Sequence, residues 1–210
     1  MQGLDLRDGV RGITAHASRD LDTLWRQVRT AAEAQTALHD ILPALISTYG
    51  IAASALAANW YDDLRDKVGV GGHFRAITPD IKDSGVQALI GWAGTTAKDD
   101  ASFQALILGG TQRRIANFSR GTVTGSSIAD PKARGWQRVG DGSCEFCEML
   151  IARGAVYTEA TADFAAHDHC SCSAVPAFDG EPKPVRSFTP SQRDSTPADR
   201  ARVRDYIATH

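Results

Sequence analysis

The sequence has no cysteine outside residues 144–172, and that window holds all four. Disulfides are therefore excluded as cross-links for the rest of the chain. The formal net charge is only −2, so the molecule as a whole is not an obvious electrostatic partner for nucleic acid or for a membrane. No stretch reaches the roughly 18 uninterrupted apolar residues that a bilayer-crossing helix needs, and no membrane association is expected.

The N-terminus also lacks the features of a secretory signal. Its first residues, MQGLDLRDGVRG, place acids beside bases and contain no apolar central region. We therefore expect synthesis in a reducing cytosol, where clustered thiols favour metal binding over disulfides. A hydrophobic content of 42% is that of a globular protein with one substantial domain or two small ones.

Apolar residues recur at steps of three and four through the first 118 residues, the period of helices with one buried face. The sequence therefore predicts a mainly α fold with an elongated helical region at 1–118. Pro43 is expected to kink or break the first helix, and Gly50 to cap it. A further helix is expected to be broken or bent near Gly109 and Gly110. The predicted helical stretches are 21–49, 51–68, 86–93 and 103–118.

The composition changes after residue 118. Residues 119–135 are polar, basic and glycine-bearing without a helical or strand period, and we expect a basic linker or exposed arm. A small α+β module rich in cysteine and histidine is expected at 136–178, with a helix from Glu145 to Gly154. Residues 179–210 are expected to form an extended tail with a short terminal helix capped at Thr196. The strand-like pieces around the module are 135–139, 154–157 and 173–178.

Six candidate metal ligands crowd into the cysteine window. Cys144 and Cys147 form a C-x2-C pair, the spacing at which a tight turn presents two thiolates to one zinc ion. A structural zinc site needs four tetrahedral ligands, so the second half of the window offers a surplus. That surplus consists of His167, His169, Cys170 and Cys172. We predict structural zinc at Cys144, Cys147 and Cys172, completed by either His167 or Cys170.

Other interpretations of the window stay open at this point. His169 is expected to support the site from outside or to face solvent, and Asp168 to orient a ligating imidazole. Two disulfides would require an oxidising compartment. Catalysis by a thiolate at Cys144 or Cys170, with a histidine as base, is a third interpretation. Nothing in the sequence marks one cysteine as special or supplies an oxyanion hole.

Residues 111–140 are distinctly basic within a nearly neutral chain. Six cations stand against the single acid Asp130, a balance of +5 (six minus one). Nucleic acid is a candidate partner for this segment, with Trp136 available to stack on a base. A solvated basic face, or one that docks on an acidic protein, explains the same pattern. The six cations are Arg113, Arg114, Arg120, Lys132, Arg134 and Arg138.

The cysteine window also carries a family resemblance. The order W-Q-R-V-x-D-G-x-C-x-F-C-x-M-L-x-x-R-G-A-V-Y, followed by F-x-A-H-x-H-C-x-C-x-A-x-P, resembles the C-terminal module of phage minor head proteins of the Mu F-like type. The form is the one of actinobacterial phages and prophages. The match is specific over residues 135–178, and upstream only the layout of helical region, basic segment and module is similar.

The resemblance implies a role in head morphogenesis. It implies a protein made in the host cytoplasm and placed in a few copies inside the capsid near the portal, where it helps assembly or genome delivery. The implied partners are the portal and the major capsid protein, with packaged DNA and further copies of the chain as additional candidates. Some relatives are labelled capsid maturation proteases. No serine of this sequence stands in a G-x-S-x-G context that would support such an activity.

Overall fold

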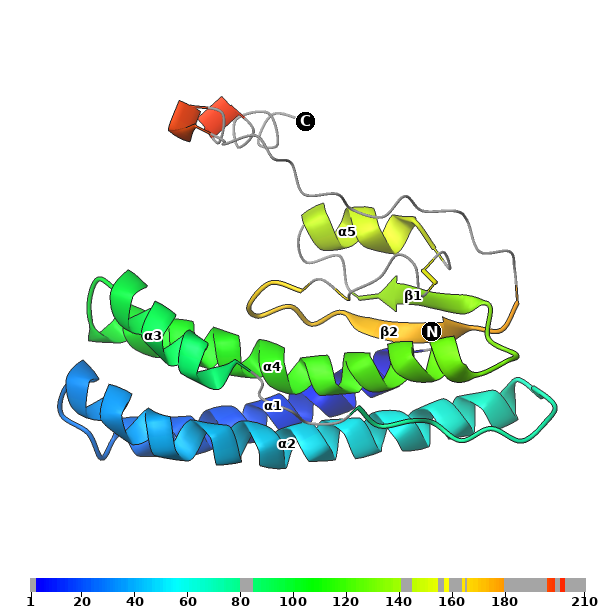
Figure 1. Cartoon of the computed structure of the whole chain (residues 1–210), viewed down its shortest axis with the longest axis horizontal. Helices are drawn as coiled ribbons and strands as arrows, with labels where there is room; N and C mark the ends of the chain where they lie inside the picture. The colour runs from blue at the N-terminus through cyan, green and yellow to red at the C-terminus, as the bar shows by residue number, and fades with distance from the viewer. Residues whose placement is uncertain are drawn as a thin grey trace.

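A computed structural model of the chain describes residues 3–79, 85–140, 145–154, 157–158, 164, 166–179, 196–198 and 201–202. Within these ranges the fold is mainly α, with one small sheet, as the sequence predicts. Four helices run along the long axis of the molecule, and the sheet and a fifth helix lie on the α4 side of this layer (Figure 1). The elements are α1 (Leu4–Trp25), α2 (Ala31–Lys67), α3 (Val86–Thr96), α4 (Asp100–Ala129), β1 (Gly135–Val139), α5 (Glu145–Ala152) and β2 (Ser173–Ala177).

The first two helices differ from the prediction in where they begin and end. α1 starts at Leu4, and its buried residues Leu6, Val10, Ala17 and Leu21 form one stripe at steps of four, seven and four. The chain breaks at residues 26–30, not at Pro43. Thr30 caps α2, because its side-chain oxygen accepts a hydrogen bond from the Glu33 amide at 3.2 Å. The predicted helix at 21–49 therefore joins the end of α1 to the start of α2.

α2 continues through Pro43 and Gly50, so the helix neither breaks at Pro43 nor is capped at Gly50. Pro43 leaves the His39 carbonyl without its helical donor, and the Gln87 side chain of α3 donates to that carbonyl instead, at 3.4 Å. Gly50 is buried, and a Cβ at this position would overlap the ring of Phe118 on α4. The freed carbonyl of His39 and the missing side chain of Gly50 thus both lie at contacts between α2 and neighbouring helices.

α4 corrects two further predictions. It passes Gly109 and Gly110 without ending, and a Cβ on Gly110 would overlap the Leu89 side chain of α3. It then continues to Ala129 through the segment expected to be a linker or arm. Thr122 and Ser127 are buried there, and their hydroxyls donate to the carbonyls of Phe118 and Val123 at 2.9 and 2.7 Å. Self-satisfied polar side chains bury this part of the helix without an apolar period.

The four helices, which we call the helical body, enclose an aliphatic core. Leu38, Leu42 and Ile46 of α2 pack in it with Ile90 of α3 and Ile107 of α4, among others. At the other end of the body, Asp130 caps α4 and lies fully buried against Arg65, with a carboxylate to guanidinium distance of 2.8 Å. Burial, and then the charge of Asp130, raise the pKa of the nearby Tyr61 hydroxyl. This end of the body thus holds a compact polar cluster.

We call β1, α5, β2 and the segment 166–172 the cysteine module. Its two strands pair antiparallel in the register Gln137 to Val175, which confirms the strand predictions at 135–139 and 173–178. The helix predicted from Glu145 is also present as α5. Of the strand expected at 154–157, the described residues show a single bridge from Trp136 to Tyr157. Trp136 is 1% exposed and stacks on Tyr157 with ring centroids 4.4 Å apart.

α2 is long and apolar enough to cross a membrane by length and composition alone, a test that core helices of soluble proteins also pass. Of the residues in its most apolar window, 33% are buried within the fold.

The tail predicted at 179–210 falls mostly outside the described residues, although those described at 197–198 and 201–202 are helical.

Candidate functional site

α5 presents Cys147 to the interior of the cysteine module. Cys147 and Leu150 are buried, whereas Phe146 and Met149 are exposed, so one face of this short helix turns inward. The spacing of three residues between Cys147 and Leu150 is that of one helical turn. Cys144, the other member of the C-x2-C pair, lies outside the described residues. Cys147 is 1% exposed, so its thiol is removed from solvent and faces the interior of the module.

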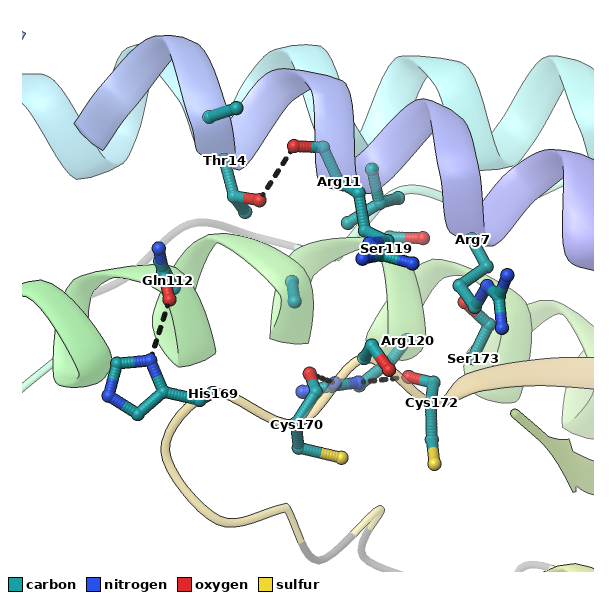
Figure 2. A pocket seen from close by; sticks show the side chains of 14 residues that line it. Arg7, Arg11, Thr14, Gln112, Ser119, Arg120, His169, Cys170, Cys172 and Ser173 are labelled. Carbon is teal, nitrogen blue, oxygen red and sulfur yellow. Dashed lines mark hydrogen bonds between the residues drawn. The ribbon is translucent and has the colours of Figure 1, made fainter. Parts of the chain in front are cut away.

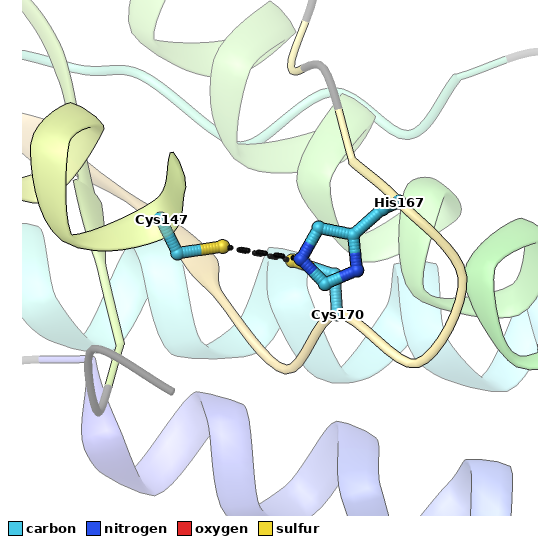
Figure 3. A group of neighbouring side chains, drawn as sticks. All are labelled: Cys147, His167 and Cys170. Atoms are coloured by element: carbon cyan, nitrogen blue, oxygen red, sulfur yellow. Dashed lines mark hydrogen bonds between the residues drawn. The ribbon is translucent and has the colours of Figure 1, made fainter. Parts of the chain in front are cut away.

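A tight turn brings the second half of the window to Cys147. The Cys170 amide donates to the His167 carbonyl at 3.2 Å, which closes the turn. His169 adopts a φ of 61°, in the left-handed region that non-glycine residues occupy only when the surrounding structure favours it. The turn places the His167 imidazole and the Cys170 thiol on the side that faces α5 (Figure 3).

The separations within this group match those of a tetrahedral zinc site. Tetrahedral angles, with Zn–S and Zn–N bonds of about 2.3 and 2.05 Å, place two sulfurs about 3.8 Å apart and a sulfur and a nitrogen about 3.5 Å apart. Cys147 Sγ lies 3.8 Å from Cys170 Sγ and 3.5 Å from His167 Nε2. All three ligand atoms lie within 4.8 Å of one another. Two of the three separations thus equal those of a tetrahedral zinc site, and the third, between Cys170 Sγ and His167 Nε2, is within 4.8 Å.

The His167 ring is oriented for coordination through Nε2. Its Nδ1 lies 2.7 Å from the Asp168 carbonyl oxygen, which can only accept a hydrogen bond. Nδ1 therefore carries the proton, and the lone pair of Nε2 points toward Cys147. The orienting group is the backbone carbonyl of Asp168. Its carboxylate instead pairs with Arg113 Nε on α4 at 3.1 Å.

Arg120 of α4 holds the other side of the turn. Its guanidinium donates to the carbonyls of Cys170 at 2.7 Å and Cys172 at 3.0 Å, and the residue is 2% exposed. A hydrogen bond with the Cys172 thiol, and then the charge of Arg120, lower the pKa of the Cys170 thiol. The same hydrogen bond and burial raise the pKa of Cys172. Cys170 is thus the member of this pair that favours the thiolate, the form that binds metal.

The structure therefore distributes the predicted ligands unevenly. His167 and Cys170, which the sequence left as alternatives, both approach Cys147. Cys172 is buried next to them, in one cluster with Cys147 and Cys170, and interacts with Cys170. Among the described residues it is not part of the compact three-atom group. His169 turns away to α4, where its Nδ1 lies 3.0 Å from the Gln112 side-chain oxygen.

The basic segment does not form one charged face. Arg120 and Arg138 are buried at 2% and 3% exposure, and Arg138 stacks on the Phe164 ring at 3.9 Å. Arg114 donates to the carbonyls of Gly110 and Gly85, at 3.1 and 3.0 Å. The exposed members are Lys132 and Arg134. Trp136 is buried and is not available to stack on a base, which corrects the expectation from the sequence.

A cavity of about 420 Å³ lies on the other side of the segment 169–173, between α1 and α4 (Figure 2). Arg7 and Arg11 of α1 line it together with Arg120 and His169. Sequence analysis did not identify Arg7 and Arg11 as functional candidates. Their spacing of four residues, which places both on one helical face, is the signal that was present in the sequence.

Comparison with known proteins identifies the family. The family model described as VG15 protein matches residues 3–195, which is most of the chain, and the chain therefore belongs to the VG15 family, a phage protein family. Neither the curated proteins nor the solved structures gave a match.

Proposed function

We propose that this member of the VG15 phage family is a minor head protein that acts inside the capsid near the portal, in head assembly or genome delivery. Family membership supports a phage protein. The finer role is supported by the resemblance of residues 135–178 to the Mu F-like head module. Within that module, the observation that carries the proposal is the Cys147, His167 and Cys170 group, whose donor atoms have the spacing of a metal site.

We further propose that this group is a structural zinc clip. Cys147, His167 and Cys170 would hold the ion, with Cys144 or Cys172 as the fourth ligand. Zinc, when bound, supplies a cross-link that a small module with little apolar core lacks. Cys147 contributes from α5 and the other two from the turn before β2. The clip therefore joins the module's helix to the strand that packs on α4, and gives a partner in the head a rigid surface.

A thiol-dependent enzyme is the runner-up, because Cys147 and His167 are close enough to act as nucleophile and base. Burial argues against it: Cys147 is 1% exposed, and a nucleophile must reach its substrate. A DNA-binding role for the basic segment is less well supported, because Arg120 and Arg138 are buried. The structural interpretation accounts for both burials.

The head role is tested on particles. DNA-filled virions and DNA-free heads of the phage or induced prophage that encodes this chain are purified, and their proteins are quantified by mass spectrometry. We expect the chain in both particles at low copy number, and we expect it to co-purify with the portal protein from gently disrupted heads. Its absence from both particles would overturn the proposal.

A matched pair of variants separates the clip from the head role. Cys147→Ser removes a ligand, and Glu148→Gln changes the adjacent exposed residue of the same helix. We expect the first variant to be missing from heads and the second to be incorporated normally. If Cys147→Ser is incorporated as well as the native chain, the clip is not needed for the head role. If it instead abolishes cleavage of a capsid protein while the fold is intact, the enzymatic alternative is correct.

A further inference from the structure

The cavity between α1, α4 and the segment 169–173 has a basic lining without acids. Its volume is about 420 Å³, within the range of small-molecule sites. Four basic side chains reach it from three segments: Arg7 and Arg11 from α1, Arg120 from α4, and His169 from the turn. No carboxylate is among the described residues that line it. The cavity therefore carries an excess of positive charge.

The cations of the cavity are held in place by different means. Arg120 donates to the Cys170 and Cys172 carbonyls and to the Asn117 side-chain oxygen at 2.8 Å, all of which are uncharged. Its guanidinium is thus buried with no carboxylate among these hydrogen-bond partners. An anion in the cavity would add a charged partner to these neutral ones.

The two arginines of α1 form the open side of the cavity. Arg11 is exposed, and Figure 2 shows its guanidinium and that of Arg7 extending from α1 toward α4 and the segment 169–173. Arg7 is partly neutralised by Asp8, at 3.1 Å, which is exposed and does not line the cavity. The hydroxyls of Ser119 and Ser173 complete the opposite wall. Guanidinium forks and hydroxyls together are typical of phosphate recognition.

We propose that this cavity is a phosphate-binding site in which Arg7 and Arg11 are the principal ligand-contacting residues and Arg120 supplies the charge of the floor. The chemistry recognised is a phosphate group with several acceptor oxygens. Two sources carry that chemistry: free phosphate, and the backbone of a nucleic acid. Cys170 lines the cavity and also belongs to the metal group, but the residues proposed to contact the phosphate lie outside that group, so the proposal does not rest on the proposed head role.

The first test measures binding of inorganic phosphate and of pyrophosphate to the full chain by isothermal titration calorimetry. We expect both to bind, and Arg11→Gln to weaken binding about tenfold, the effect of losing one charge-assisted hydrogen bond. Arg7→Gln combined with Arg11→Gln should abolish it. Arg19→Gln, an exposed residue of the same helix that does not line the cavity, is the matched control and should bind normally.

The second test distinguishes the two sources with a short single-stranded DNA oligonucleotide. A backbone ligand is indicated if the oligonucleotide binds more tightly than phosphate, weakens steeply with salt and is displaced by pyrophosphate. A free phosphate ligand is indicated if phosphate binds and the oligonucleotide does not. Either result supports the site, provided that the Arg7 and Arg11 variants reduce binding. The proposal is overturned if neither probe binds, or if binding is unchanged in the double variant.

Metal content provides an independent readout in the same samples. The Arg7 and Arg11 variants should retain the metal of the native chain, because neither residue belongs to the Cys147, His167 and Cys170 group. A loss of phosphate binding with unchanged metal content and unchanged melting temperature therefore assigns the effect to the cavity. A loss of phosphate binding that appears only together with unfolding would contradict the assignment.

Discussion

The helical body and the cysteine module are stabilised in different ways. The body buries a large aliphatic cluster contributed by all four helices. The module's own cluster consists of Cys147, Cys170 and Cys172, with Ile151, Phe164 and Ala166 packed around it. Its other large side chains, such as Trp136, pack in a cluster shared with the body. The body therefore has an apolar core of its own, whereas we expect the module to depend on its docking to α4 and on the thiol and imidazole group.

The difference between body and module is tested most directly by removing one of the proposed metal ligands. Cys147→Ser should abolish metal binding and disorder the module, because a structural zinc site contributes on the order of 10 kcal/mol to a small domain. Helical content by far-ultraviolet circular dichroism should change little, whereas the part of the near-ultraviolet signal that Trp136 contributes, as one of four tryptophans, should be lost. Glu148→Gln should leave both signals intact. A Cys147→Ser variant with the native near-ultraviolet spectrum would show that the module does not need the site.

The second largest effect is expected within the body, at the buried ion pair. Asp130→Asn should lower the free energy of unfolding by about 3–5 kcal/mol, because it leaves the Arg65 charge buried beside a neutral group. The side chains of Arg65 and Asp130 are 5% and 0% exposed. Asp62→Asn breaks an exposed pair with Arg75, whose side chain is 77% exposed, and should cost less than about 1 kcal/mol. Urea unfolding of the two variants tests the contrast. Equal costs would contradict it.

A smaller effect of the same kind concerns close helix packing. Gly110→Ala should destabilise the chain by about 1–3 kcal/mol, because its Cβ would overlap Leu89, which is itself buried. Gly12→Ala places the same methyl in open space on α1 and should stabilise the chain by up to about 1 kcal/mol through helix propensity. Thermal melts should therefore shift in opposite directions. Shifts in the same direction would mean that the α3–α4 contact is looser than described.

The smallest effect is expected at the start of α4, where Asp99 caps the helix and accepts a hydrogen bond from the Ser102 amide at 2.7 Å. This bond lowers the pKa of Asp99 below its usual 3.8. A carboxyl with a depressed folded-state pKa contributes stability that is present above its unfolded pKa and is lost as the pH falls through its folded pKa. Asp99→Asn keeps a cap but should flatten the acid side of the stability profile. An unchanged profile would contradict a role for the charge.

Local patterns predicted much of this architecture. The predicted elements include the helical segments 51–68 and 86–93, the strands at 135–139 and 173–178, and the helix from Glu145. Each depends on a pattern of residues within one helix or strand. The contacts at the His39 carbonyl and at Gly50 were not predictable in this way, because Gln87 and Phe118 approach from other helices.

The sequence did not predict the C-terminal part of α4 or the geometry of the site, for related reasons. Residues 119–129 bury serine and threonine that hydrogen-bond within the helix, so a search for apolar periods finds no helix. The cysteine window itself predicted a metal site. The choice among its ligands depends on the left-handed turn at His169 and on Arg120, which comes from fifty residues earlier in the chain and bonds to the Cys170 carbonyl. Spacing along the sequence contains neither fact.

The central claim, a metal-bound group that holds the module, is tested most directly by X-ray absorption spectroscopy and metal analysis of the full chain purified under reducing conditions. We predict about one zinc ion per chain, with sulfur at about 2.3 Å and nitrogen at about 2.0 Å in the first shell. Chelation should release the ion together with the near-ultraviolet signal of Trp136. A metal-free chain whose thiols are alkylated without a change in that signal would contradict the account.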